Sequence, residues 1–346
     1  MLLFYMGGFI AAGHAVLTVR TAQGAIAWSV SLVSFPFVAL PAYLVLGRSK
    51  FEGFVEAYAD RAAEIDEKLD EFSRGIERYE VADPERSGMF AALRGLSGFN
   101  PTNGNRAELL INGQQTFDSI LAGLAGAQDY ALVQFYMFHD DRLGRRIKDV
   151  LIERARAGVD VYMLYDEIGS QGLPPSYLDE LREAGVAVSA FKPTRGRRNR
   201  FQLNFRNHRK LVVVDGRTAW VGGHNVGDEY LGLDPDMSPW RDTHVRLEGP
   251  VVQQFQLVTL GDWYWATRQL PDLNWQPTAA GDDGSVAMAI PFSPAARLET
   301  AGLFFVGALQ TARNRIWISA PYFAPDEAVL KALELAALRG VDVRIM

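Results

Sequence analysis

The residues best suited to chemistry are His208, Lys210 and Asp215, which lie in the stretch NHRKLVVVDGRTAWVGGHN. Their spacing is H-x-K-x4-D, and G-G-x-N follows. A neutral imidazole can act as a nucleophile, a lysine ammonium can bind a phosphate oxygen, and amide groups can stabilise charge that develops on such oxygens. The pattern therefore predicts an anion-binding site that contains a nucleophile.

A β-hairpin is expected to position these residues. Residues 211–214 form an apolar run rich in valine, Asp215 with Gly216 is a strong turn signal, and residues 218–221 fit the returning strand. Side chains alternate along a strand, so His208 and Lys210 should share one face. The returning strand should bring three further residues to the end of the hairpin that carries the histidine: Gly222, Gly223 and Asn225.

Each member of the pattern also has a structural explanation. A histidine beside a strand is more often a packing residue than a reactive one. Asp215 could be no more than the first residue of an Asp-Gly turn, and Lys210 could be a solvated strand residue. However, H-x-K-x4-D together with G-G-x-N at this distance rarely arises by chance. We therefore favour the anion-binding site.

The pattern resembles the HKD motif of the phospholipase D superfamily. Three further segments resemble bacterial cardiolipin synthases in the same order, namely WRDTHVRLEGP, GDW and APYFAPD at residues 240–250, 261–263 and 320–326. The resemblance covers nearly the whole chain and implies an α/β fold, the phospholipase D-like α-β-α sandwich. One departure is the pair Gly222-Gly223, where family members commonly carry Gly-Ser.

The resemblance also implies a reaction. Two HKD motifs would face each other and transfer a phosphatidyl group between two phosphatidylglycerol molecules, with release of glycerol, through a phosphohistidine and without a metal or other cofactor. His208 would be the nucleophile, by resemblance, and Lys210 would stabilise the phosphoryl charge. The alternatives are a membrane-anchored phosphodiesterase that uses water or another alcohol as acceptor, and a non-catalytic membrane module.

Four residues are expected to support the reaction. Asn225 and Gly223 would bind the substrate phosphate. Asp242 would orient His208, or else form a surface ion pair with Arg241. Tyr136 would line the pocket, although an aromatic residue at the end of a strand is more often part of the core.

Composition excludes several classes of function. The 346 residues include no cysteine, which rules out disulfides and cysteine-ligated metals. A net charge of −6 argues against a nucleic-acid partner, which needs a broad basic surface. One run of eight cations without an acidic residue predicts a loop that faces substrate or membrane, unless it is simply solvated: Lys192, Arg195, Arg197, Arg198, Arg200, Arg206, Arg209 and Lys210.

The N-terminus carries two apolar runs, residues 2–19 and 25–46, each about long enough for a membrane span. A cleaved signal peptide is the alternative, but the first run lacks a basic start and a second run follows at once. We expect a hairpin of two transmembrane helices. Arg48 and Lys50 then place the catalytic domain on the cytoplasmic side of the bacterial inner membrane, as a multi-pass protein.

An amphipathic helix is expected from Phe51 to Ile76, where apolar residues recur every three or four positions. It could lie on the membrane, on a partner subunit or on its own domain. Pro84 and the glycine-rich stretch up to Gly104 predict a linker. The predicted division is residues 1–47 for the membrane helices, 48–104 for this helix and linker, 105–275 for a first phospholipase D-like half, and 276–346 for the start of a second half.

An internal repeat supports two halves. A strand at 131–138, a helix at 145–157 and a strand at 159–165 recur as a strand at 315–322, a helix at 326–339 and the segment GVDV at 340–343, which copies residues 158–161. No other histidine is followed two residues later by a lysine. We expect the second HKD motif to come from a missing C-terminal half, or from a second subunit.

Overall fold

The computed structural model describes residues 2–19, 21–47, 62–81, 87–191, 206–281, 284–293 and 298–346. The chain divides into two compact units. One comprises residues 1–80 and 102–287, and the other comprises residues 81–101 and 288–346. The segment expected as a linker up to Gly104 is thus divided, because residues 81–101 belong to the second unit and residue 102 begins a strand of the first.

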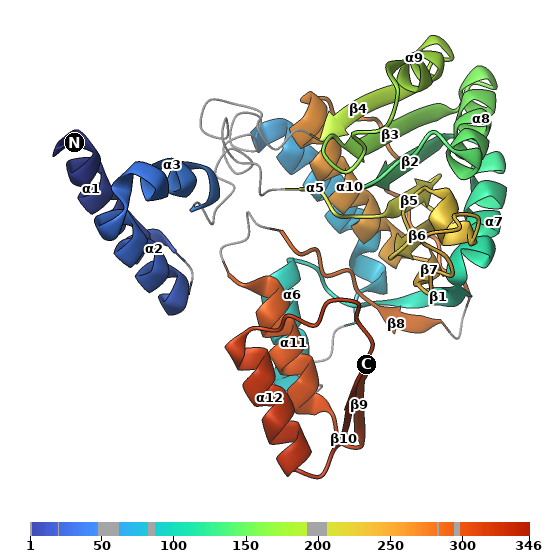
Figure 1. Cartoon of the computed structure of the whole chain (residues 1–346). Helices are drawn as coiled ribbons and strands as arrows, with labels where there is room; N and C mark the ends of the chain where they lie inside the picture. The colour runs from blue at the N-terminus through green and yellow to red at the C-terminus, as the bar shows by residue number, and fades with distance from the viewer. Residues whose placement is uncertain are drawn as a thin grey trace. The chain divides into compact units, whose positions relative to one another are not determined.

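The first unit is built around a mixed eight-stranded sheet. Its strands are β1 (Thr102–Ile111), β2 (Tyr130–Phe135), β3 (Asp160–Asp166), β4 (Ala187–Phe191), β5 (Leu211–Val214), β6 (Thr218–Gly222), β7 (Thr243–Glu248) and β8 (Ser285–Ala287). Their order is β4-β3-β2-β5-β6-β7-β1-β8 (Figure 1). The first three in this order are parallel, and the remaining pairs are antiparallel.

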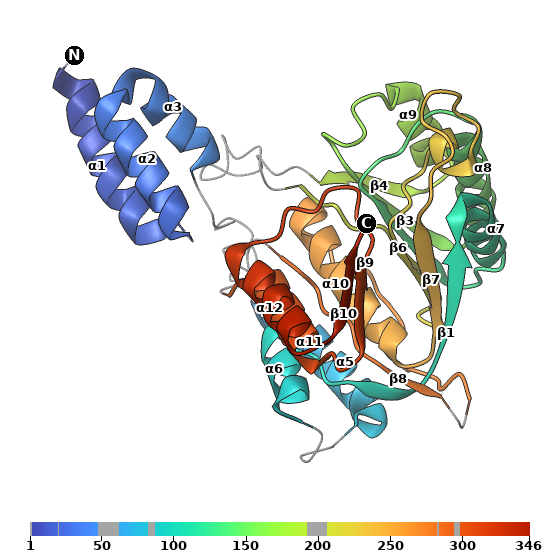
Figure 2. The same ribbon diagram turned by 60° about the horizontal axis from the view of Figure 1, so that its bottom comes forward.

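Helices cover both faces of this sheet. Helices α7 (Asn112–Ala125), α8 (Arg142–Arg156) and α9 (Pro175–Glu183) lie on one face, and α10 (Val251–Thr267) lies on the other (Figures 1 and 2). The predicted α-β-α sandwich is therefore confirmed. Its main apolar core lies under α7, α8 and α9 and includes the fully buried Phe117, Ile147 and Val212.

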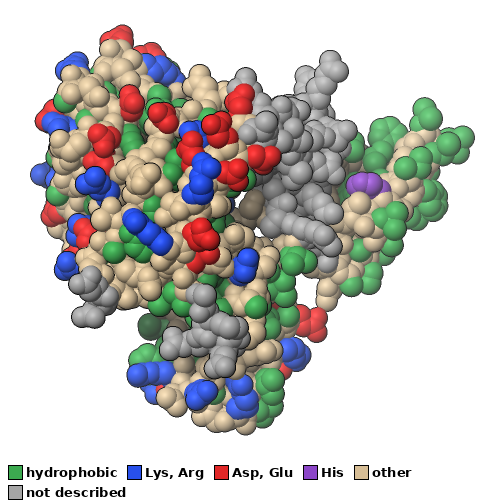
Figure 3. Space-filling model, turned by 180° about the vertical axis from the view of Figure 1, so that it is seen from behind, with side chains coloured by type: hydrophobic (Ala, Val, Ile, Leu, Met, Phe, Trp, Pro, Cys, Tyr) green, Lys and Arg blue, Asp and Glu red, His purple; other side chains and the backbone are tan. Residues whose placement is uncertain are grey.

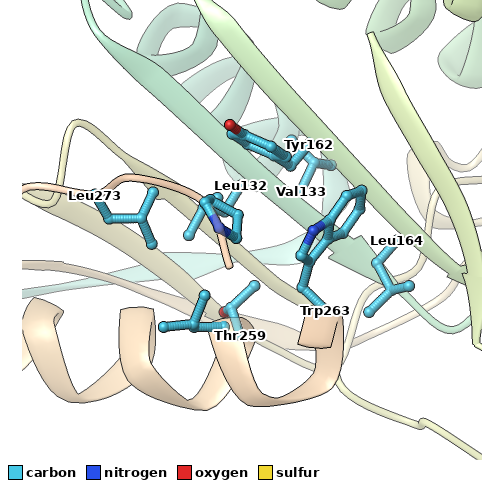
Figure 4. A pocket seen from close by; sticks show the side chains of 9 residues that line it. Leu132, Val133, Tyr162, Leu164, Thr259, Trp263 and Leu273 are labelled. Carbon is cyan, nitrogen blue, oxygen red and sulfur yellow. The ribbon is translucent and has the colours of Figure 1, made fainter. Parts of the chain in front are cut away.

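Helix α10 packs closely against β2 and β3. Figure 4 shows Thr259 and Trp263 of α10 facing Leu132 and Leu164 of the strands. The ring centres of Trp263 and Tyr162 are 5.3 Å apart in an edge-on arrangement. The small pocket between these elements has no charged side chain in its lining, so we assign it to packing.

The predicted hairpin forms at β5 and β6. Its turn places Asp215 and Gly216 at φ angles of 52° and 63°, and the Arg217 N–H donates to the Val214 carbonyl over 3.0 Å. Asp and Gly tolerate such left-handed backbone angles better than other residues. The Asp-Gly signal in the sequence therefore located this turn correctly.

The second unit repeats a part of the first. Its elements are α6 (Ser87–Ser97), α11 (Thr300–Thr311), β9 (Arg315–Ile318), α12 (Glu327–Leu338) and β10 (Asp342–Ile345). Strands β9 and β10 are parallel, as are β2 and β3. Gly158 and Gly340, which follow the two equivalent helices, have φ angles of 93° and 84°. The predicted internal repeat is therefore present in the backbone.

Three apolar helices, rather than the expected two, begin the chain: α1 (Leu2–Thr18), α2 (Ala22–Ser34) and α3 (Pro36–Leu46). The second apolar run breaks at Phe35, whose φ and ψ are −133° and 57°. Proline disfavours helical angles in the residue before it and is well suited to begin a helix, so α3 begins at Pro36. Judged over the described residues, every helix is too short or too polar to cross a membrane.

The predicted amphipathic helix is seen as α5 (Ala62–Ile76). Phe72 packs edge-on against Trp275 with ring centres 6.0 Å apart, and Ile76 is buried. Over this range the helix packs on its own unit. The earlier part from Phe51, the cations Arg48 and Lys50, and the basic run over residues 192–205 lie outside the described residues.

Candidate active site

His208 and Lys210 lie on the segment that leads into β5. The His208 side chain is exposed, whereas Lys210 is 5% exposed. Lys210 Nζ lies 3.2 Å from His208 Nδ1 and donates a 2.7 Å hydrogen bond to the His208 carbonyl. The structure thus brings the expected nucleophile and the expected cation into contact.

Tyr136, directly after β2, packs against both side chains. Its ring centre is 4.6 Å from the His208 ring centre and 5.3 Å from Lys210 Nζ. Tyr136 lies beside His208 and Lys210 because β2 and β5 pair antiparallel, with Gln134 opposite Leu211. Residues that follow β2 therefore lie beside residues that precede β5, and Tyr136 is at this site rather than in the core.

The surroundings favour a neutral imidazole. Burial and the neighbouring Lys210 both lower the pKa of His208, and Asp166 opposes them only in part. Burial lowers the pKa of Lys210 to about 8, against the opposing effect of Asp242 and Asp166. At neutral pH His208 can therefore offer a lone pair while Lys210 is still mostly charged.

Asn225 and Gly223 are close to this region, but their amides are engaged within the protein. Asn225 Oδ1 accepts from the Met137 N–H over 3.1 Å, and its Nδ2 donates to the Tyr230 hydroxyl over 2.8 Å. The Gly223 N–H donates to the Thr243 carbonyl over 3.1 Å. The structure therefore does not present either amide as a free donor for phosphate. The Asn225 side chain bonds to Met137, after β2, and to Tyr230, and the Gly223 N–H bonds to Thr243, at the start of β7.

Asp242 lies against Gly223 rather than on His208. A Cβ added at Gly223 would come within 2.1 Å of the Asp242 carboxylate, which accounts for glycine at this position. Asp242 Oδ1 accepts from the Thr243 N–H over 2.7 Å, and its charge acts on Lys210. Arg241 donates to the Asp242 main-chain carbonyl and to the Thr243 hydroxyl, and no ion pair with the Asp242 carboxylate is found among the described residues. Within the described part of the chain Asp242 has no hydrogen bond to His208.

Asp215 lies at the opposite end of β5 from His208, which corrects its expected place in the site. The four strand residues between Lys210 and Asp215 each add about 3.3 Å. Asp215 instead accepts three backbone N–H groups at the start of β2, from Gln128, Asp129 and Tyr130, over 2.9, 2.8 and 2.9 Å. The hairpin turn and these three hydrogen bonds explain why an aspartate occupies position 215.

Replacing Asp215 with alanine is expected to lower the free energy of unfolding by roughly 2–4 kcal/mol, because three donors lose a charged acceptor and alanine is strained at positive φ. Asp215→Asn should cost less, since asparagine tolerates the angle and keeps one acceptor. Urea unfolding measures both. The kcat of the folded variants should equal that of the wild type, and a large loss of kcat would contradict this structural role.

Two buried carboxylates that could not be identified as site residues from the motif bond to the neighbours of His208 in the chain. Asp166, the last residue of β3, accepts from the Asn207 N–H over 2.9 Å. Asp262 of α10 accepts from Asn207 Nδ2 over 2.8 Å and also from Arg209. A signal was present, because Asp166 follows a predicted strand directly and Asp262 is the acidic residue of the GDW segment.

A pair of buried histidines lies near Lys210. The Nδ1 atoms of His224 and His244 are 3.0 Å apart, and the backbone N–H of His224 donates to His244 Nδ1. Burial lowers the pKa of both, that of His244 to about 3, and the charge of Lys210 adds to the effect on His244. Both rings are therefore neutral and packed at physiological pH.

One group among the described residues has the composition of a metal site: His139, Asp141 and Glu229, with ligand atoms within 4.8 Å of one another. These side chains already have partners. His139 Nδ1 lies 3.6 Å from Glu229 Oε2, and Asp141 accepts from the N–H groups of Gly144 and Asp228 over 2.9 and 2.7 Å. We therefore regard the group as an ion pair beside a helix cap.

Comparison with known proteins places this site in a family. A family model described as "Cardiolipin synthase, PLD-like domain" matches residues 120–255 and 305–346. Cardiolipin synthase A of Pseudomonas putida (strain GB-1) is 48% identical over 347 residues, covering 99% of this chain and 72% of that protein. Cardiolipin synthase A of Pseudomonas syringae pv. syringae (strain B728a) is 47% identical over 351 residues, with 99% and 73% covered. The solved phosphatidylserine synthase of Haemophilus influenzae Rd KW20 shares the fold, with a TM-score of 0.51 at 12% identity over 75% of this chain and 65% of that one.

Proposed function

Because the chain belongs to the cardiolipin synthase family of phospholipase D-like proteins, we propose that it is a phosphatidyltransferase that makes cardiolipin. It would join two phosphatidylglycerol molecules and release one glycerol. The observation that carries this proposal is the exposed His208 held 3.2 Å from the buried Lys210. Such a pair offers a nucleophile and a cation to one phosphate.

The chemistry divides into two transfers. In the first, a His208 ring nitrogen forms a bond to phosphorus, and the bond from phosphorus to the glycerol oxygen breaks. The leaving oxygen takes a proton from an acid. In the second, the free hydroxyl of another phosphatidylglycerol loses a proton, attacks phosphorus and releases His208. Lys210 stabilises the phosphoryl oxygens in both steps.

The acid would be the histidine of a second HKD motif. The sequence has four other histidines, and none is followed two residues later by a lysine. We infer that the second motif comes from a C-terminal half or from a second subunit. It would protonate the leaving glycerol and then deprotonate the acceptor, which is the ordinary exchange of acid and base roles in a two-step transfer.

The test of this function uses vesicles of pure phosphatidylglycerol. Purified protein should convert two molecules of this lipid into one cardiolipin and one glycerol. If neither product forms, the proposal is wrong. The second candidate is hydrolysis, because the His208 side chain is exposed and water could therefore serve as the acceptor. It would give phosphatidic acid in place of cardiolipin, so the ratio of the two lipids distinguishes them.

We infer that α1, α2 and α3 together anchor the protein in the bacterial cytoplasmic membrane, with the catalytic domain on the cytoplasmic side. Residues 2–19 and 21–47 contain no Lys, Arg, Asp or Glu. Large apolar side chains are exposed along these helices, among them Leu3, Ile10, Leu17 and Val38. Figure 3 shows hydrophobic side chains over much of the surface of these helices, at the right of the view. Such a surface is favourable in lipid and costly in water.

Deleting residues 1–47 is therefore expected to release the protein from membranes. In a flotation assay with phosphatidylglycerol vesicles, the bound fraction should fall by at least about tenfold, because the apolar surface that partitions into lipid is lost. His208→Ala is the control, since it should leave flotation unchanged. If the shortened protein floats as well as the whole chain, another surface carries the attachment.

A further inference from the structure

The two neighbours of His208 in the chain are held on the side of α10. The Asn207 side chain donates to Asp262 Oδ2 over 2.8 Å, and Arg209 donates to Asp262 Oδ1 over 2.6 Å. Side chains alternate in an extended segment, so residues 207 and 209 point to one side and His208 and Lys210 to the other. One carboxylate therefore holds both residues that flank the nucleophile.

Asp262 is well placed for this task. Its side chain is 2% exposed, and it also accepts from Gln134 Nε2 of β2 over 2.7 Å. A carboxylate is stable at such a position only when charge and hydrogen bonds compensate it. Arg209 supplies the charge, and Asn207 and Gln134 supply further donors. The compensation links α10, β2 and the His208 segment through a single side chain.

The main chain of the segment is fixed from a second direction. Asp166 Oδ2 accepts from the Asn207 N–H over 2.9 Å, and Asn207 Oδ1 accepts from the Arg209 N–H over 3.1 Å. Every polar group of the Asn207 side chain is thus used. Among the described residues the His208 side chain has one hydrogen bond, to Lys210 Nζ, so it takes its direction from this main chain and from the ring of Tyr136.

We propose that Asp262 is a positioning residue for His208, acting through Asn207 and Arg209 to hold the imidazole in line with the substrate phosphorus. This inference rests on the proposed function. A displacement of a nucleophile by about 1 Å can cost on the order of 100-fold in rate. Loss of the Asp262 carboxylate should therefore lower kcat without removing any group that touches the substrate.

The experiment measures kcat and KM with phosphatidylglycerol in mixed micelles, together with the folded fraction by circular dichroism. Asp262→Asn keeps the shape but loses the charge. It should lower kcat about 30–100-fold and change KM by less than about twofold. Arg209→Gln leaves Asp262 bonded to Asn207 and Gln134 and should give a smaller loss of the same kind, so it serves if Asp262→Asn folds poorly. The double variant should be no slower than Asp262→Asn, because both changes break the same link.

The matched controls are Asp179→Asn and Arg182→Gln. These residues form an exposed ion pair of 3.0 Å on α9, so the same chemical changes there should leave kcat unchanged. A wild-type kcat per folded molecule in Asp262→Asn and Arg209→Gln would overturn the positioning role and leave the proposed function intact. Full turnover in His208→Ala would instead overturn the proposed function, and the positioning role with it.

Discussion

Replacing His208 with alanine should lower the rate of glycerol release from phosphatidylglycerol vesicles by at least about 1000-fold, because the variant lacks the imidazole that forms the covalent intermediate. The structure of the variant should be unaffected. The His208 side chain is exposed, and among the described residues it bonds to Lys210 and packs against the Tyr136 ring. The melting temperature should therefore stay within a few degrees of the wild-type value, as expected for a surface substitution.

His208→Gln is the control for packing. Glutamine has a similar size and can still accept a hydrogen bond from Lys210, yet it cannot act as the nucleophile. The variant should be as inactive as His208→Ala. If glutamine restored a substantial rate, the side chain would matter for the shape of the site and not for a bond to phosphorus. Wild-type turnover in either variant would refute the assignment of His208.

The elements around the site could be predicted because their signals are local. The Asp215-Gly216 pair located the hairpin turn, and the valine-rich run before it located β5. The copied GVDV segment located the repeat, since in both copies its glycine must adopt a positive φ after a helix. Such signals depend on backbone preferences within a few residues and need no knowledge of distant contacts.

The roles of Asp215, Gly223 and Asn225 could not be predicted, for a geometric reason. Spacing along the chain does not state which end of a strand a residue occupies, and the strand β5 separates Asp215 from His208. Nor does a sequence show which donors are already engaged. The amides of Gly223 and Asn225 bond to Thr243, Met137 and Tyr230, residues that only the folded sheet brings near.

The contact between Asp262 and Asn207 could not be predicted either, because a sequence does not show which distant residues the fold brings together. Asp262 lies more than fifty residues along the chain from Asn207, yet their side chains are 2.8 Å apart. Each is an ordinary residue in its own segment, and their partnership follows from the packing of α10 on the sheet. The N-terminal region differs from the prediction for a local reason. Residues 25–46 are one apolar run and were expected to form one helix, but Pro36 ends the first helix at Phe35 and begins a second.

The pH dependence of kcat/KM should have a descending alkaline limb with a midpoint near pH 8, set by Lys210. Burial lowers the pKa of Lys210 to about 8. The charged form stabilises the phosphoryl oxygens, so activity should be full well below pH 8 and should fall about tenfold per unit above it. An acid limb should lie below pH 6.5, because burial and Lys210 lower the pKa of His208 and the nucleophile must be neutral.

Lys210→Arg distinguishes Lys210 from other sources of the alkaline limb. Arginine keeps its charge at every pH at which the protein is folded. The variant should be slower, since the planar guanidinium does not fit the place of the ammonium, but its kcat/KM should not decline between pH 7 and about 9.5. If the limb near pH 8 persists unchanged in Lys210→Arg, another group titrates there. The acid limb should be the same in both proteins or move slightly, because a positive neighbour of His208 is present in each and continues to disfavour the imidazolium.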